Sequence, residues 1–151
     1  PNLLVSRTFS KAYGLAALRV GYGLSTPVVA DVLNRVRQPF NVNSLALAAS
    51  CAALQDEDYL AESRRLNESG MQQLEAGFRD LGLSWIPSKG NFIAVDLGRE
   101  AAPVFQGLLR EGVIVRPVAN YGMPNHLRVT IGLPAENTRF LEALAKVLAR
   151  G

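Results

Sequence analysis

A lysine and an arginine, Lys11 and Arg19, stand eight positions apart in a segment that is otherwise apolar and rich in glycine, SRTFSKAYGLAALRVGYGLS (residues 6–25). Two hydroxyl side chains, Thr8 and Ser10, lie just before the lysine. A lysine amine that is partly desolvated beside another cation has a lowered pKa and becomes a nucleophile. An arginine fork assisted by hydroxyl groups binds a phosphate dianion. The four residues together predict a site for an aldehyde that carries a phosphate, the chemistry of pyridoxal 5′-phosphate.

The elements that position this lysine can be read from the flanking residues. Apolar runs predict strands over residues 3–9 and 20–24, with a loop or helical turn over 12–18 between them. Lys11 would then lie just past the end of a strand, where α/β sheets bind ligands. A solvated lysine and a structural arginine in a loop remain an alternative, because short motifs also occur by chance.

Three later segments place polar side chains at or in apolar strands. Asn91 starts a strand in SKGNFIAV, Arg116 ends one in GVIVRPV, and Arg128 lies inside one in HLRVTIG. Burying an arginine is costly unless an anion pairs with it. That anion could be Glu100 or Glu136, or it could belong to a ligand. Arg116 could equally be a surface residue, and Asn91 could cap backbone groups in a turn.

Strands and helices alternate along the chain, which predicts an α/β fold. Further strands are expected over 83–86, 92–97, 113–115 and 127–131, and helices over 26–37, 45–54, 56–81, 101–112 and 136–149. The character of the sequence changes between residues 40 and 60. Before it we expect the end of a larger, mainly parallel sheet, and after it a compact α+β unit.

Composition excludes several classes of protein. The chain has 151 residues, of which 48% are hydrophobic and 19% charged, so disorder is not expected. The net charge of +3 comes from scattered basic residues without a basic stripe, and we expect no nucleic-acid partner. No apolar run approaches the roughly 20 residues that span a bilayer, so we expect no membrane segment. The default location is therefore the cytoplasm.

Neither the single cysteine nor the single histidine indicates a disulfide or a metal site. Cys51, in the run LALAASCAAL, cannot form an internal disulfide and is expected to be a small buried apolar residue. His126 has no metal-ligand spacing to another residue, so no metal site is predicted.

The string SKAYGLAALRVGY resembles the cofactor-lysine segment of fold type I pyridoxal-phosphate aminotransferases, Ser-Lys-(x)₂-Gly-Leu-Ala-Gly-Leu-Arg-x-Gly. Within that family it is most similar to the histidinol-phosphate aminotransferase subfamily, which the segment PFNVN (residues 39–43) also resembles. One departure is Ala17, where the family usually has glycine. The resemblance covers the whole chain, as the C-terminal part of such an enzyme.

The resemblance implies a fold and a set of cofactor residues. Residues 1–55 would be the end of the large domain's mixed sheet, and residues 56–151 a small α+β C-terminal domain. Lys11 would bond to pyridoxal 5′-phosphate and then move protons as a general base and acid. Thr8, Ser10 and Arg19 would hold the cofactor phosphate.

The resemblance also implies an activity. Arg128, assisted by Arg116 and Asn91, would bind the acidic group of a small phosphorylated substrate. The enzyme would transfer an amino group between L-histidinol phosphate and 2-oxoglutarate in histidine biosynthesis, as a homodimer. Alternatives are an aromatic amino-acid aminotransferase, a threonine-phosphate decarboxylase or a non-catalytic phosphate-binding module. Groups that the family places before the lysine are absent from this sequence, so we expect the isolated chain to be inactive.

Overall fold

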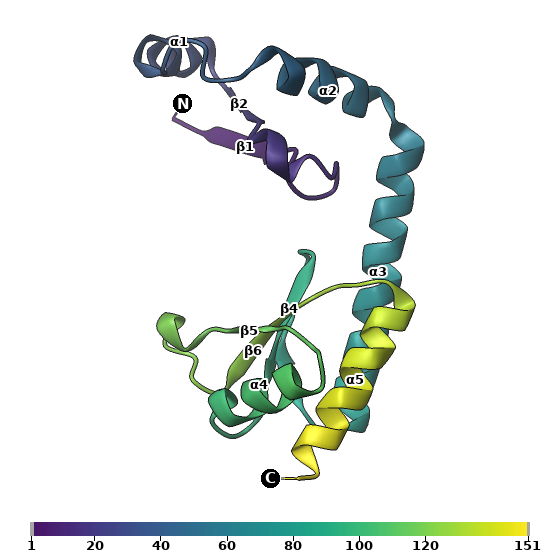
Figure 1. Cartoon of the computed structure of the whole chain (residues 1–151). Coiled ribbons are helices and arrows are strands. Elements are labelled where there is room, and N and C mark those ends of the chain that lie inside the picture. Colours follow the sequence, from purple (N-terminus) through teal and green to yellow (C-terminus); the bar gives the residue numbers. More distant parts are fainter. Residues whose placement is uncertain (1, 151) are drawn as a thin grey trace. The chain divides into compact units, whose positions relative to one another are not determined.

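The computed structural model describes residues 2–150. The chain divides into two compact units, Pro1–Arg64 and Arg65–Gly151. The boundary between them falls inside the longest helix, α3 (Glu57–Asp80), whose first turns belong to the first unit. Figure 1 shows the elements of both units, and each unit is described by itself.

A β-hairpin opens the first unit. Strands β1 (Leu4–Thr8) and β2 (Gly21–Ser25) confirm the two strands expected there. These two strands run antiparallel from Leu4↔Ser25 to Thr8↔Gly21, which is compatible with the mixed sheet expected for this part of the chain. Consecutive strands joined without a crossover helix can only pair in this way. The link carries a single 3-10 turn, η1 (Ala16–Leu18).

Two helices follow the hairpin as expected, α1 (Pro27–Val36) and α2 (Ser44–Gln55). Pro27 occupies the first turn of α1, where its missing N–H costs nothing. Asn43 caps α2, its side-chain oxygen accepting a hydrogen bond from the Ala46 backbone N–H at 2.8 Å. A loop over residues 38–43 separates the two helices.

The core of the first unit is small. Its buried apolar residues are Phe9, Val20 and Ala46, with Tyr13, Leu15, Leu18, Val42 and Ala53 packed against them. The expectation that Cys51 is buried is wrong, because its side chain is exposed on α2. Only Ala46 and Ser50 of that helix are buried, so the apolar composition of α2 overstated how much of it packs.

The second unit is an antiparallel sheet with helices. The strand order is β3-β4-β6-β5. Its strands are β3 (Ser84–Ile86), β4 (Phe92–Asp96), β5 (Arg116–Pro117) and β6 (His126–Thr130). Besides the remainder of α3, it contains α4 (Ala101–Arg110), a 3-10 turn η2 (Ala119–Tyr121) and α5 (Pro134–Leu148).

The expected strand over 113–115 is wrong, and the strand there begins only at Arg116. The backbone N–H of Val113 donates to the Leu108 carbonyl at 2.9 Å, so this segment closes the end of α4 instead of joining the sheet. Gly112, with φ of 73°, makes the turn that allows it. Helix α5 also begins earlier than predicted, with Pro134 inside its first turn.

The sheet of the second unit has two different faces. One face carries Ile93, Val95, Leu127 and Val129, which are all buried. These side chains belong to one apolar core with residues of the three helices, among them Leu74, Phe78, Leu108, Phe140 and Leu144. Since side chains alternate along a strand, Phe92, Ala94 and Arg128 lie on the opposite face.

Candidate functional site

Lys11 lies in a tight turn directly after β1. The backbone N–H of Gly14 donates to the Lys11 carbonyl at 2.8 Å, and that of Leu15 donates to the Phe9 carbonyl at 2.9 Å. Gly14 has a φ of 70°, which favours glycine. The Lys11 side chain is exposed and makes no hydrogen bond or ion pair within residues 2–150. Its amine is therefore not engaged by another described residue.

The three predicted phosphate-binding residues come together beside this turn. The Arg19 Nη1 donates to Ser10 Oγ at 3.4 Å and to the Ala16 carbonyl at 2.8 Å. The backbone N–H of Ser10 donates to Thr8 Oγ1 at 3.1 Å. Both hydroxyl oxygens accept, and no described residue accepts their protons, which stay available for an anion. A guanidinium with two free hydroxyl donors fits a phosphate group.

The packing behind the turn fixes these residues. Phe9, only 3% exposed, lies between Thr8 and Ser10 in sequence, and its ring is 4.9 Å from that of Tyr13. Its backbone N–H donates to the Val20 carbonyl at 3.2 Å, which extends the hairpin past β1. Ala17, the departure from the family pattern, is exposed in η1, so its methyl group displaces nothing.

The second group of predicted residues lies on the open face of the sheet in the second unit. Arg128 of β6 pairs directly with Arg116 of β5 on one side and with Ala94 of β4 on the other. Like charges directly opposite each other across two strands destabilise a sheet. This arrangement therefore favours an anion that neutralises both guanidinium groups.

The environment of Arg128 supports the same conclusion. Its Nε is buried without a hydrogen-bond partner, and its guanidinium lies 4.8 Å from the centre of the Phe92 ring. Neither Glu100 nor Glu136 forms an ion pair with it among the described residues. The carboxylate of Glu136 instead accepts from the Leu133 backbone N–H at 2.8 Å, at the start of α5. No internal carboxylate of residues 2–150 therefore neutralises Arg128.

Arg116 and Asn91 lie on segments that adjoin Arg128. The Arg116 Nη2 donates to Tyr121 Oη at 3.3 Å. The backbone carbonyl of Asn91, just before β4, accepts from the Ile131 N–H at 2.9 Å, just after β6. The half-buried Asn91 side chain makes no hydrogen bond within the described part of the chain. Its amide is thus available to a ligand.

Each predicted group is brought together within its own unit. Lys11, Thr8, Ser10 and Arg19 belong to the first unit, and Asn91, Arg116 and Arg128 to the second. The sequence did not single out Phe92, although its place next to Asn91 in an alternating strand puts it on the face of Arg128.

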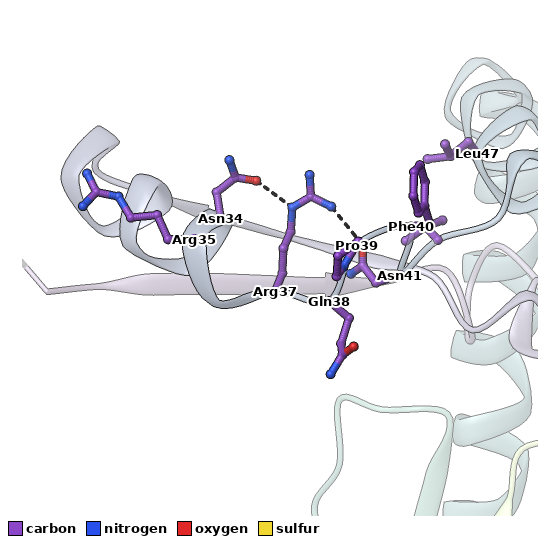
Figure 2. Close-up of a pocket in the computed structure, with 9 residues that line it drawn as sticks. Asn34, Arg35, Arg37, Gln38, Pro39, Phe40, Asn41 and Leu47 are labelled. Atoms are coloured by element: carbon purple, nitrogen blue, oxygen red, sulfur yellow. Dashed lines mark hydrogen bonds between the residues drawn. The ribbon is translucent and has the colours of Figure 1, made fainter.

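A separate hollow of about 730 Å³ lies around the segment that follows α1 (Figure 2). Arg37 crosses it, donating from Nε to Asn34 Oδ1 at 2.6 Å and from Nη1 to Asn41 Oδ1 at 3.1 Å. Phe40 is 98% exposed there. The amide of Asn41 thus serves a local turn, and none of the predicted site residues lines this hollow.

Comparison with known proteins identifies the class. The family model "Aminotransferase class I and II" matches residues 1–144. The chain therefore belongs to the class I and II aminotransferases. In the described part of the chain, no helix is both long enough and apolar enough to cross a membrane.

The chain is also similar to individual curated relatives and solved structures. The chain is 95% identical over 150 residues to histidinol-phosphate aminotransferase 2 of Pseudomonas fluorescens Pf-5, covering 99% of this chain and 40% of that protein. It resembles the crystal structure of histidinol-phosphate aminotransferase from Sinorhizobium meliloti in complex with pyridoxal-5′-phosphate, with a TM-score of 0.88 and 36% identity over 99% of this chain and 42% of that one. L-threonine-O-3-phosphate decarboxylase from Porphyromonas gingivalis gives a TM-score of 0.83 and 27% identity over 98% of this chain and 47% of that one. The chain thus spans about 40% of the length of the curated relatives it matches.

Proposed function

We propose that this chain supplies the reactive lysine and the anion-binding arginines of a pyridoxal-phosphate aminotransferase that acts on L-histidinol phosphate and 2-oxoglutarate. The observation that carries the proposal is the cluster of Arg19, Ser10 and Thr8, next in sequence to Lys11, whose amine has no partner among residues 2–150. The 95% identity to a histidinol-phosphate aminotransferase supports the choice of substrate.

In this proposal the residues of the hairpin turn hold the cofactor. Arg19, with the hydroxyl protons of Ser10 and Thr8, would hold the phosphate, and Lys11 would supply the amine next to the aldehyde. When bound, pyridoxal phosphate supplies a ring that withdraws electrons from the substrate Cα. As a free amine, Lys11 would accept the proton from that Cα and later return one, as a general base and acid.

The open face of the second unit binds the substrate's acidic group. Arg128 and Arg116 face each other across β6 and β5 and hold one anion between them. The Arg128 guanidinium packs against the Phe92 ring, 4.8 Å from its centre, and the side-chain amide of Asn91 is available to the ligand. A phosphate dianion balances both positive charges, whereas a carboxylate balances one.

The proposal extends to the organisation of the protein. Residues 1–55 would complete the cofactor-binding domain, and residues 56–151 would form the small domain. We place the enzyme in the cytoplasm as a homodimer. Large apolar side chains exposed on the first unit, such as Phe40 at 98%, Val28 at 75% and Leu3 at 70%, support association with further polypeptide.

The test compares amino donors on a full-length protein that carries this chain. We expect kcat/KM for histidinol phosphate to exceed that for phenylalanine, with 2-oxoglutarate as acceptor. A preference for phenylalanine would indicate an aromatic amino-acid aminotransferase instead. The isolated chain should show no turnover, and turnover at a normal rate would contradict its proposed dependence on other residues.

A second candidate is a threonine-phosphate decarboxylase, favoured by the structural likeness to the Porphyromonas gingivalis enzyme. Threonine phosphate carries the same phosphate group for the two arginines, so only the reaction distinguishes the candidates. Release of carbon dioxide from threonine phosphate, without transfer of its amino group to 2-oxoglutarate, would favour the decarboxylase.

A further inference from the structure

Tyr121 is held in a fixed position beside Arg116. It ends the 3-10 turn η2, and its backbone N–H donates to the carbonyl of Val118 at 2.9 Å. Val118 is only 2% exposed and so anchors the turn in the core. Gly122 follows with a φ of 75°, which redirects the chain toward β6. The backbone therefore presents the Tyr121 ring at a defined place, with the ring 56% exposed.

The hydroxyl of Tyr121 has an unused proton. Because a guanidinium only donates, Tyr121 Oη must accept in its 3.3 Å bond with Arg116 Nη2. No acceptor among residues 2–150 takes the hydroxyl proton. The local cluster of two arginines and one hydroxyl therefore has donor protons without an acceptor among residues 2–150, and an anionic ligand would supply acceptors for them.

Arg116 needs this support because its own strand is short. Strand β5 consists of Arg116 and Pro117 alone, at the edge of the sheet. The exposed Arg116 guanidinium is repelled by Arg128, its direct cross-strand partner. The hydrogen bond to Tyr121 opposes that repulsion and keeps Arg116 near the position that an anion would occupy.

We infer that Tyr121 is a specificity-determining residue of this anion site, which positions Arg116 and donates its own proton to a phosphate. The inference rests on the proposed function and deepens it. A phosphate monoester has three free oxygens and nearly two negative charges, enough for two guanidinium groups and a hydroxyl. A carboxylate has two oxygens, which one arginine fork already satisfies. Tyr121 therefore favours the phosphorylated substrate over 2-oxoglutarate.

The test is Tyr121→Phe in the full-length protein, which removes the hydroxyl and keeps the ring. We expect KM for histidinol phosphate to rise about tenfold, the loss of a hydrogen bond to a charged group. The value of kcat and KM for 2-oxoglutarate should stay within about twofold. Equal rises in both KM values, or no rise in either, would overturn the inference. Tyr22→Phe is the matched control, because it removes a tyrosine hydroxyl from β2 in the first unit.

A double-mutant comparison tests whether Tyr121 acts through Arg116. A phosphate-binding measurement separates the role of Tyr121 from the proposed function. If Tyr121 acts partly through Arg116, then Tyr121→Phe should have a smaller effect in an Arg116→Ala background than alone. Equal effects in both backgrounds would overturn the positioning role. Binding of inorganic phosphate, measured by calorimetry, should weaken in Tyr121→Phe even if histidinol phosphate is not a substrate. Unchanged phosphate binding would overturn the role of Tyr121, and phosphate binding without transamination would overturn only the proposed function.

Discussion

Among residues 2–150, no carboxylate pairs with Arg19 or Arg128, but the two arginines lie in different backbone conformations. Arg19 has a φ of 51°, in the left-handed region that most residues avoid. Such backbone strain is often retained at functional sites. Arg128 lies in regular strand geometry in the middle of a ladder, and its cost comes from the burial of Nε. Each arginine therefore lowers stability locally, which a binding role would explain.

Replacing Arg19 by lysine tests its role in binding the cofactor. Arg19→Lys keeps the charge but loses the planar fork that reaches both Ser10 Oγ and the Ala16 carbonyl. We expect the dissociation constant of pyridoxal phosphate to rise about tenfold in the full-length protein, measured by equilibrium dialysis. Arg7→Lys, in the neighbouring β1, is the control and should not change it. Equal affinity of Arg19→Lys and the unchanged protein would remove Arg19 from the phosphate site.

Replacing Arg128 by methionine separates a structural role from a binding role. Because no carboxylate of residues 2–150 neutralises Arg128, Arg128→Met should change the free energy of unfolding by no more than about 1 kcal/mol. KM for histidinol phosphate should rise by at least about tenfold. Urea denaturation and steady-state kinetics measure the two effects. A large loss of stability with unchanged KM would mean that Arg128 supports the fold and does not bind substrate.

At the scale of elements, one turn connects β6 to α5 and is held by a buried amide. Asn137, 2% exposed, accepts from the Gly132 N–H at 2.9 Å and donates to the Gly132 carbonyl at 3.1 Å. Its amide also donates to Gln73 Oε1 of α3 at 3.2 Å. Helix α3 approaches closely because Gly70 has no side chain, and a Cβ there would lie 2.6 Å from Ile131 Cγ2. This network fixes the end of the strand that carries Arg128.

Removing the buried amide should weaken the second unit. Asn137→Ala leaves the N–H and carbonyl of Gly132 without partners, so we expect a loss of about 2 kcal/mol in the free energy of unfolding. Thr138→Ala is the neighbouring control, and it should cost less because its hydrogen bonds are exposed. Urea denaturation gives both values. A smaller loss for Asn137→Ala than for Thr138→Ala would show that the turn does not depend on Asn137.

The ion pairs of Glu111, at the end of α4, predict that the stability of the second unit depends on pH. Glu111 accepts from Lys146 Nζ at 2.6 Å and from Arg150 Nη1 at 2.9 Å. The hydrogen bond from Lys146, with the charges of Lys146 and Arg150, lowers the pKa of Glu111 below its ordinary value of 4.5. The stabilisation is therefore complete above that ordinary value and is lost as pH falls through the lowered pKa.

Glu111→Gln should accordingly lower Tm at neutral pH and lose its effect in acid. The comparison is the Tm difference between the variant and the unchanged chain, followed from neutral pH to well below pH 4.5. Glu142→Gln, on the exposed side of α5, is the control and should change Tm little. A Tm difference that stays constant across this range would contradict an ionised Glu111 as its cause.

At the scale of the whole molecule, the two units differ in how much of their apolar surface they bury. The second has a continuous core that includes Leu74, Phe78, Ile93, Leu127 and Leu144, all fully buried. Among its described residues, the first unit buries three apolar side chains, Phe9, Val20 and Ala46, and exposes many others. Since burial of apolar surface drives folding, the first unit should be the less stable in this chain.

Hydrogen exchange on the 151-residue chain measures this difference. Amide protons in β1 and β2 should exchange at least about tenfold faster than those in β4 and β6, because opening the first unit exposes little additional apolar surface. Because all four strands are measured in the same sample, β4 and β6 serve as the control for β1 and β2. Equal protection of the two pairs of strands would contradict a difference in local stability.

The sequence predicted the elements that local patterns determine. Pro27 and Gly82 predict the start of one helix and the end of another. In the structure, α1 begins at Pro27, and Gly82, with φ of 68°, follows the end of α3 at Asp80. Lys11, Thr8, Ser10 and Arg19 were predicted as one group, because they are close in sequence. The strand expected over 113–115 was wrong, since the hydrogen bond of Val113 to the end of α4 is not visible in a pattern of apolar residues.

The sequence did not predict which residues lie opposite each other on neighbouring strands. Arg116 and Arg128 were each predicted as ligands of an anion, but only the register of β5 against β6 places them opposite each other. The hydrogen bond between Arg116 and Tyr121 could not be predicted either, because nothing in the spacing of the two residues connects them. Cys51 was expected to be buried because its neighbours are apolar, although most residues of α2 are exposed in the described part of the chain.

The most direct test of the central claim is chemical mapping of the reactive lysine. A full-length protein that carries this chain would be incubated with pyridoxal phosphate, reduced with borohydride and digested for peptide mass mapping. This chain has three lysines, Lys11, Lys89 and Lys146. We predict that the cofactor label is found on Lys11 and is lost in Lys11→Ala. A label on Lys89, Lys146 or any other lysine, with Lys11 unmodified, would contradict the account.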